Sequence, residues 1–185
     1  MFLTSAKKYF STGKLRAFFQ SLYDFGFTPT TLTIISAVFK ILVVVALLYR
    51  EPGLAAVAVV FDFLFDFLDG GVARATGKST TRGALLDFVS DRVFRAFWLF
   101  AAAYSGLVSY EIALLTMMVS SFAYFMNDFV EFKKLKHLTW LLAYHHFIFW
   151  GMLFGNMEEW LIAGIVINGF FTLTNIISVF LMNKR

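Results

Sequence analysis

Acidic side chains inside long apolar segments are the feature that most constrains this chain. The stretch from Phe61 to Leu68 sets Asp62 and Asp66 among bulky apolar residues, and Asp69 follows directly. A carboxylate at the centre of a membrane helix costs about 2.5–3.5 kcal/mol on insertion scales. Something in the fold must compensate these charges, so the aspartates are candidates for a functional site.

The apolar segments are long enough to cross a membrane. Hydrophobic residues make up 59% and charged residues 15% of the 185 residues, whereas soluble domains are about half apolar and about a quarter charged. About 20 helical residues cross the hydrocarbon core. We predict an all-α polytopic membrane protein with six transmembrane helices, at Leu32–Tyr49, Leu54–Ala75, Arg82–Tyr104, Glu111–Phe132, Leu138–Phe154 and Trp160–Met182.

Basic residues indicate the orientation. They gather before the first span, between spans two and three, between spans four and five, and at the C-terminus. The opposite side has Arg50 as its one base. The positive-inside rule therefore predicts that both termini and the acidic end of the bundle face the cytoplasm, in the plasma membrane. The net charge of +4 then indicates anchoring to anionic membrane lipids, and no nucleic-acid partner is expected.

Residues 1–31 form an expected interfacial arm before the bundle. Basic residues alternate there with large apolar ones such as Phe18, Phe19 and Leu22, a pattern typical of an amphipathic helix lying on the membrane surface. Cysteine is absent, which excludes disulfides and thiolate metal sites. No repeat or linker is evident, so we predict a single domain over 1–185, with the six-helix bundle at 32–182.

Two sets of aspartates share helix faces. Asp62, Asp66 and Asp69 are spaced i, i+4 and i+7, and Asp87 and Asp91 are four residues apart, so each set projects from one side of its helix. Neighbouring helices that turn these sides together form a cage of hard oxygen ligands, which suits Mg²⁺, Mn²⁺ or Ca²⁺ rather than zinc. A pair of such cations serves in-line displacement at phosphorus.

The residues beside the aspartates suit a phosphate ligand. Gly70 and Gly83 allow a close approach to the backbone, and Ala73 is also small. Arg74 offers a planar fork of donors that fits phosphate. Asp91 is a candidate general base where it is not fully committed to metal.

The spacing of these residues resembles the signature of the CDP-alcohol phosphotransferase (phosphatidyltransferase) family. That signature is Asp, two residues, Asp-Gly, two residues, Ala-Arg, eight residues, Gly, three residues, Asp, three residues, Asp. The chain keeps every spacing with Asp66, Asp69, Gly70, Ala73, Arg74, Gly83, Asp87 and Asp91. Thr28-Pro29 also resembles the family's entry to the first span, although Thr30 stands where Asn or Asp is usual.

The resemblance implies a reaction in phospholipid biosynthesis. Family members bind a CDP-linked donor, usually a lipid, transfer its substituted phosphate to a small alcohol and release CMP, and they are commonly homodimers. By resemblance, two divalent cations, Mg²⁺ or Mn²⁺, are held by Asp66, Asp69, Asp87 and Asp91. Asp91 is then also the general base. The nucleotide and diphosphate pocket is lined, by the same resemblance, by Gly70, Ala73, Arg74 and Gly83.

The motifs leave the acceptor open. Asp91-Arg92 resembles the subgroup that acts on inositol phosphate, and the spare cations for a phosphorylated acceptor are Arg92, Arg95 and Lys40. Arg95 departs from that subgroup, which often has another Asp at this position. The sequence favours a phosphorylated polyol such as inositol phosphate or glycerol phosphate, with serine and amino alcohols as alternatives.

Structural roles compete with binding for several polar residues. Asp62 and Arg95 are expected at similar depth on facing helices, so we favour an Asp62–Arg95 ion pair over an acceptor-binding Arg95. Lys40 is expected to snorkel or to pair with an acid. His145 and His146 are adjacent in sequence and do not share a helix face, which favours packing over a metal pair.

Two other classes of function fit part of the pattern. An aspartate-rich membrane prenyltransferase also binds a metal-diphosphate in a helical bundle, but it does not account for Ala73, Arg74 and Gly83 together. A cation transporter also carries intramembrane carboxylates, yet the last two spans are nearly free of acidic residues. CMP as the product, rather than inorganic diphosphate or ion flux, separates the three.

Overall fold

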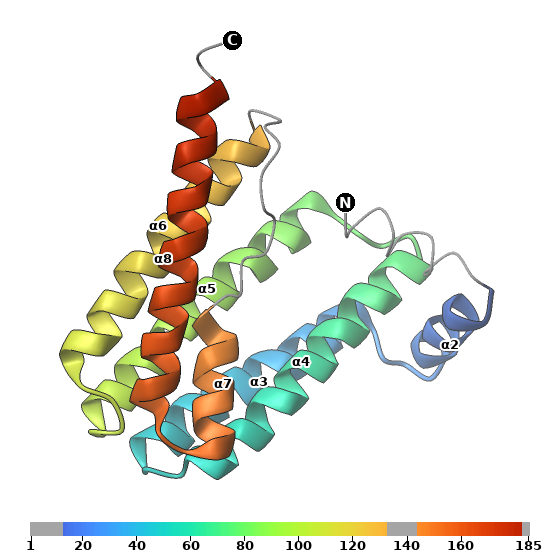
Figure 1. The fold of residues 1–185 in the computed structure, drawn as a ribbon. Coiled ribbons are helices and arrows are strands. Elements are labelled where there is room, and N and C mark those ends of the chain that lie inside the picture. The colour runs from blue at the N-terminus through green and yellow to red at the C-terminus, as the bar shows by residue number, and fades with distance from the viewer. Residues whose placement is uncertain (1–12, 133–143, 183–185) are drawn as a thin grey trace. The chain divides into compact units, whose positions relative to one another are not determined.

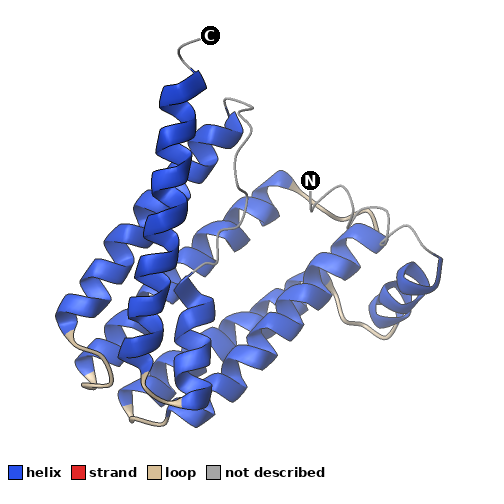
Figure 2. Cartoon of the chain, in the orientation of Figure 1, coloured by secondary structure: helices blue, strands red, loops and turns tan. Residues whose placement is uncertain are grey.

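Helices make up all the regular structure of the residues that the structure describes. A computed structural model describes residues 13–132 and 144–182, and over these residues no strand is present (Figure 2). The predicted all-α class is confirmed for this part of the chain. The helices are α2 (Gly13–Asp24), α3 (Pro29–Leu48), α4 (Pro52–Ala75), α5 (Thr81–Tyr104), α6 (Tyr110–Phe132), α7 (Tyr144–Phe154) and α8 (Met157–Met182).

The helix boundaries lie within a few residues of the predicted spans at five of the six segments. For the fifth segment, the described part is α7, and residues 138–143 lie outside the described chain. Two helical stretches, Pro29–Leu48 and Met157–Leu181, are long and apolar enough to cross a membrane. The count of six transmembrane helices stays a prediction.

Local hydrogen bonds and one glycine form the turn between α4 and α5, which joins the two halves of the acidic motif. Gly77 adopts a φ of 69°, a left-handed conformation that glycine adopts without strain. The N–H of Lys78 then donates to the carbonyl of Ala73 at 2.9 Å. Thr80 caps the start of α5 by accepting a hydrogen bond from the N–H of Gly83 at 3.0 Å. These bonds fix the start of α5 and thereby the positions of Asp87 and Asp91 along it.

The chain divides into two compact units. One consists of residues 1–44 and 57–94, and the other of residues 45–56 and 95–185. Among the described helices, the first unit holds α2, most of α3 and α4, and the first half of α5, while the second holds the rest of α5 with α6, α7 and α8. The prediction of a single domain over 1–185 stays a prediction.

In the first unit, α2 packs on α4 through Phe19. This ring is 1% exposed and belongs to a core with Leu32, Val72 and Ala75. It lies directly over Gly71, where a Cβ would come within 2.3 Å of the ring. A glycine at this position therefore permits the close approach of α2, which lies beside α4 in Figure 1. A helix is thus present within the predicted N-terminal arm, and its place at the membrane surface stays a prediction.

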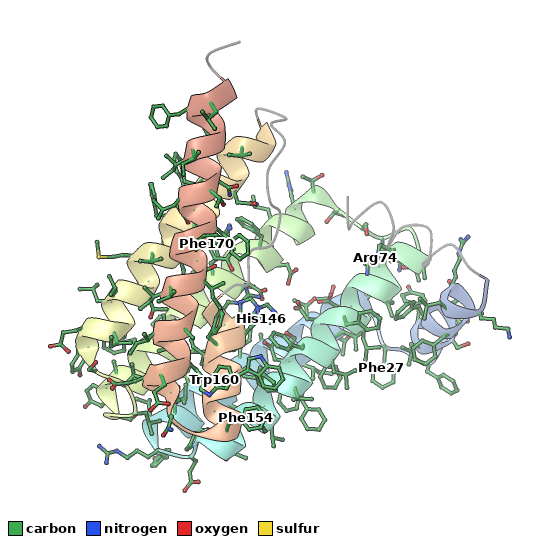
Figure 3. All side chains as sticks on the ribbon, viewed as in Figure 1. Phe27, Arg74, His146, Phe154, Trp160 and Phe170 are labelled. Atoms are coloured by element: carbon green, nitrogen blue, oxygen red, sulfur yellow. The ribbon has the colours of Figure 1, made fainter. Side chains whose placement is uncertain are left out.

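In the second unit, α7 and α8 run side by side (Figure 1). Their close approach depends on two glycines, because a Cβ at Gly151 would lie 2.8 Å from the Cα of Met157 and one at Gly164 would lie 2.8 Å from the ring of Phe147. Near the turn between them, the rings of Trp150 and Trp160 lie 6.4 Å apart. Figure 3 labels Trp160 in this aromatic group.

Candidate metal centre

Three carboxylates from two helices meet in the first unit. One oxygen each from Asp66 and Asp69 of α4 and from Asp87 of α5 lies within 4.8 Å of the other two. No second group of three or more His, Asp or Glu side chains with this geometry occurs among the described residues. The helical spacing predicted a shared face for Asp66 and Asp69, and the fold brings Asp87 to that face. Like charges this close repel each other unless a cation lies among them.

Asp69 is oriented by a third helix. The hydroxyl of Thr33 on α3 donates to Oδ2 of Asp69 at 2.7 Å, and the same hydroxyl lies 3.0 Å from the carbonyl oxygen of Pro29. Thr33 was not singled out from the sequence. Its signal was nevertheless present, because Thr33, Ser36 and Lys40 are spaced i, i+3 and i+7 and so form a polar stripe on a helix that is otherwise apolar from Leu32 onward.

Lys40 extends this stripe into the acidic cluster and is only 4% exposed. Its Nζ lies 3.0 Å from Oδ1 of Asp62, 3.0 Å from Oδ1 of Asp91 and 3.4 Å from Oδ1 of Asp66. It also donates to Oγ of Ser36 at 2.8 Å, and Ser36 donates to Asp62 at 2.7 Å. One ammonium thus joins α3, α4 and α5.

These contacts bear on two expectations, one about the partner of Lys40 and one about the partner of Asp62. The prediction that Lys40 pairs with an acid is confirmed. Asp62 was expected to pair with Arg95, but the cation that reaches it within the first unit is Lys40. The expectation placed the partner of Asp62 on the following helix, and a cation reaches it from the preceding helix. Arg95 belongs to the second unit, and the Asp62–Arg95 pair stays a prediction.

Asp91 lies beside Lys40 and outside the group of three clustered carboxylates. Its side chain is 16% exposed, against 3% for Asp62. Its two expected roles, as a metal ligand and as the general base, stay predictions.

The residues expected to line a nucleotide pocket flank the three carboxylates along the chain. A Cβ at Gly70 would come 3.0 Å from Nη1 of Arg74, so this glycine leaves room for the guanidinium along α4. Ala73 is half-buried and Gly83 is exposed near the start of α5. Arg74 lies near the C-terminal end of α4, where Figure 3 labels it. Their role in binding a nucleotide stays a prediction.

Two further expectations concern the cations for an acceptor and the histidine pair. The guanidinium of Arg92 lies 3.5 Å from the centroid of the Phe88 ring, a cation–π contact on α5.

The rings of His145 and His146 on α7 lie 4.1 Å apart, and His145 is only 7% exposed. Neither histidine belongs to a group of potential metal ligands in the described residues, and burial of His145 agrees with the packing role.

Comparisons with known proteins point to one family. A family model described as CDP-alcohol phosphatidyltransferase matches residues 27–171. Archaetidylinositol phosphate synthase of Pyrococcus horikoshii is 36% identical over 101 residues, which are 55% of this chain and 54% of that protein. Phosphatidylinositol phosphate synthase of Mycobacteroides abscessus is 38% identical over 104 residues, 52% of this chain and 46% of that protein. The chain thus spans about half the length of these curated relatives.

Solved structures share the fold. The crystal structure of Mycobacterium tuberculosis phosphatidylinositol phosphate synthase with CDP-DAG bound superposes with a TM-score of 0.65 at 18% identity, over 87% of this chain and 92% of that one. A second structure of the same enzyme, in complex with manganese and citrate, has a TM-score of 0.62 at 19% identity, over 87% of this chain and 84% of that one.

Proposed function

The chain belongs to the CDP-alcohol phosphatidyltransferase family, and we propose that it transfers a substituted phosphate group from a CDP-linked lipid to an alcohol and releases CMP. One observation supports this most directly. Asp66, Asp69 and Asp87 keep the spacing of the family signature, and their oxygens come within 4.8 Å of one another. The reaction requires that the aspartates of the signature lie close enough together to share metal ions, and these three do.

The donor set fits divalent cations. Carboxylate oxygens are hard ligands of the kind that Mg²⁺ and Mn²⁺ prefer, and the three clustered carboxylates carry charge that requires such a partner. We assign Asp66, Asp69 and Asp87 to two cations, with Asp91 as a further ligand. When bound, the cations supply charge neutralisation for the diphosphate of the donor. The manganese complex of the structural relative is consistent with this assignment.

The remaining residues position the substrates and move a proton. Arg74 binds a phosphate oxygen of the donor, and Gly70, Ala73 and Gly83 leave room for the nucleotide beside the backbone. Asp91 accepts the proton of the acceptor hydroxyl as its oxygen attacks the phosphorus on the lipid side. The bond from that phosphorus to the CMP oxygen breaks, and CMP leaves.

The acceptor we propose is a phosphorylated polyol, with inositol phosphate before glycerol phosphate. Two curated relatives are named as synthases of archaetidylinositol phosphate and of phosphatidylinositol phosphate. The two named products share inositol phosphate and differ in the lipid, which supports inositol phosphate as the acceptor here. We assign Arg92 to the acceptor phosphate, with Arg95 as the alternative where it does not pair with Asp62. The pairing of Lys40 with three carboxylates argues against giving it the same task.

The membrane placement follows the family. Large apolar side chains on α3, among them Ile34, Val38, Ile41 and Val45, are 40–60% exposed, which suits a surface that faces lipid. We propose six transmembrane helices, α2 lying at the interface, both termini and the carboxylate cluster on the cytoplasmic side of the plasma membrane, and a homodimer.

The deciding experiment is product analysis with purified protein in detergent. Radiolabelled CDP-lipid is supplied with Mg²⁺ or Mn²⁺ and a panel of inositol phosphate, glycerol phosphate, serine and amino alcohols. We expect CMP release with one acceptor, complete loss with EDTA and recovery with excess metal. Inorganic diphosphate as the product would indicate a prenyltransferase, and metal flux into liposomes without CMP would indicate a transporter.

An Asp91→Asn variant tests the proposed base in the same assay. We expect turnover to fall about 10²- to 10⁴-fold, as for other general bases. Glu111→Gln is the matched control, because this exposed carboxylate at the start of α6 lies outside the acidic cluster. Full turnover of Asp91→Asn would show that another group takes the proton.

A further inference from the structure

Lys40 has more partners than one ion pair requires. An ammonium has three N–H donors, and four oxygens lie within 3.4 Å of its nitrogen, those of Ser36, Asp62, Asp66 and Asp91. The side chain is 5% exposed. A cation enclosed in this way is poorly placed to bind a phosphate that arrives from outside, so its task is internal.

The partners of Lys40 connect the proposed base to a fixed part of the fold. Asp62 is 2% exposed and also accepts from Ser36. Ser36 is itself 1% exposed, on the same face of α3 as Lys40. Through the ammonium, Asp91 of α5 is thereby tied to a buried pair of residues on α3 and α4. The Asp91 carboxylate thus contacts an ammonium whose other partners include the buried Ser36 and Asp62.

The formal charges agree with an internal role. Asp62 stands outside the group of three clustered carboxylates, and the charge of Lys40 offsets it. The other acidic side chains of the motif, Asp66, Asp69, Asp87 and Asp91, then carry four negative charges, which two divalent cations balance. A buried charge left without a partner is strongly destabilising, so Lys40 and Asp62 are best considered together.

We propose that Lys40 is a positioning residue, which holds the Asp91 carboxylate in the orientation needed to take the proton of the acceptor. The inference rests on the proposed function, because Asp91 is the base only in that reaction. Lys40 touches neither donor nor acceptor. It acts through Asp91, with Asp62 and Ser36 as its anchor.

The test uses a variant that keeps the charge of the site. Lys40→Met alone would leave Asp62 buried without a cation. If that variant failed to fold, the unpaired charge of Asp62 would explain the failure, and nothing would be learned about Asp91. The double variant Lys40→Met/Asp62→Asn removes one positive and one negative charge together. Asp62→Asn alone, which keeps Lys40, is the reference. The double variant, the reference and the unaltered protein are compared by thermal unfolding in EDTA, by Mg²⁺ binding without substrates, and by kcat and the acceptor KM.

We expect the double variant to fold and to bind Mg²⁺ within about threefold of Asp62→Asn, because the carboxylate cluster and its charge are intact. Its kcat should fall about 10- to 100-fold below that of Asp62→Asn at an unchanged acceptor KM, since small displacements of a reacting group have effects of this size. The Mg²⁺ titration reports on the cluster without reference to activity.

Other outcomes would overturn the proposal. A kcat equal to that of Asp62→Asn would mean that Lys40 only offsets the charge of Asp62. A raised acceptor KM at unchanged kcat would mean that Lys40 binds the acceptor. Loss of Mg²⁺ binding in the double variant would mean that Lys40 instead holds the metal-binding carboxylates in place, through its contact with Asp66. Failure of the proposed function is separate, because the unaltered protein would then release no CMP with any acceptor.

Discussion

The two units bury polar side chains of different kinds. In the first unit they are Ser36, Lys40 and Asp62, and Asp62 of α4 lies 2.7 Å from Ser36 and 3.0 Å from Lys40 of α3. In the second unit they are neutral hydroxyls and amides with one histidine, at Ser105, Thr116, Ser120, His145, Asn168, Thr172 and Asn175. Opposite charges and interhelical bonds therefore characterise the first unit, and uncharged groups dominate the second.

The bonds made by these groups differ as well. Thr116 and Thr172 donate to carbonyls of their own helices, each at 2.7 Å. The side-chain amides of Asn168 and Asn175 are buried without a hydrogen-bond partner among the described residues. A neutral group inside a membrane protein costs far less than a charge, so such residues are tolerated without a hydrogen-bond partner. Buried charges are found where each has several oppositely charged or hydrogen-bonding partners. Such partners occur in the first unit, which carries the acidic motif.

The largest effect is expected from removing one of the three clustered carboxylates. Asp87→Asn should lower CMP release by about 10³-fold, since metal-assisted charge stabilisation is worth several kcal/mol. In EDTA the variant should unfold at the same or a higher temperature, because one like charge is gone from a group whose oxygens lie within 4.8 Å.

Glu159→Gln, an exposed substitution at the start of α8 in the second unit, is the control and should leave both values unchanged. A lower unfolding temperature of Asp87→Asn in EDTA would mean that the carboxylate supports the fold itself, and the contrast between the charged groups of the first unit and the neutral groups of the second would weaken.

A smaller effect is expected on the packing of α2 in the first unit. Gly71→Ala places a methyl group 2.3 Å from the Phe19 ring, so the free energy of unfolding should fall by about 1–3 kcal/mol. Adding Phe19→Leu should recover part of the loss. The measurement is thermal or denaturant unfolding in detergent.

The matched control for this contact lies in the second unit. A methyl group at Gly169 of α8 would meet no atom of the described chain within 4 Å beyond its chain neighbours and the adjacent backbone of its own helix, so Gly169→Ala should be neutral or stabilise the helix by up to about 1 kcal/mol. Equal stability of Gly71→Ala and Gly169→Ala would show that α2 does not pack on α4 as described.

The smallest effect is expected from a buried amide of the second unit. Asn168→Leu exchanges an amide that has no hydrogen-bond partner in the described part of the chain for an apolar side chain with the same number and branching of heavy atoms. Stability should change by less than about 1 kcal/mol, and a modest gain is expected because an unsatisfied polar group is removed. CMP release should be unchanged. A large loss of activity would show that the neutral groups of the second unit also serve the reaction.

The sequence by itself determined the helices and the composition of the acidic cluster. Apolar runs and turn residues located α3 to α6 and α8 within a few residues, because helix length and local capping are encoded nearby in the chain. The i, i+4 and i+7 spacing placed Asp62, Asp66 and Asp69 on one face of α4, because 3.6 residues per turn is a property of the backbone and does not depend on neighbouring helices.

Tertiary structure alone decided which side chains complete the cluster. Thr33, Ser36 and Lys40 share a face of α3, but periodicity does not say toward which helix a face turns. The sequence therefore left Lys40 free to snorkel or to pair, and matched Asp62 with Arg95 on a depth argument. Packing of α3 against α4 and α5 brought Thr33 to Asp69 and Lys40 to Asp62 and Asp91. Such contacts follow from how whole helices bury their surfaces, which no local pattern contains.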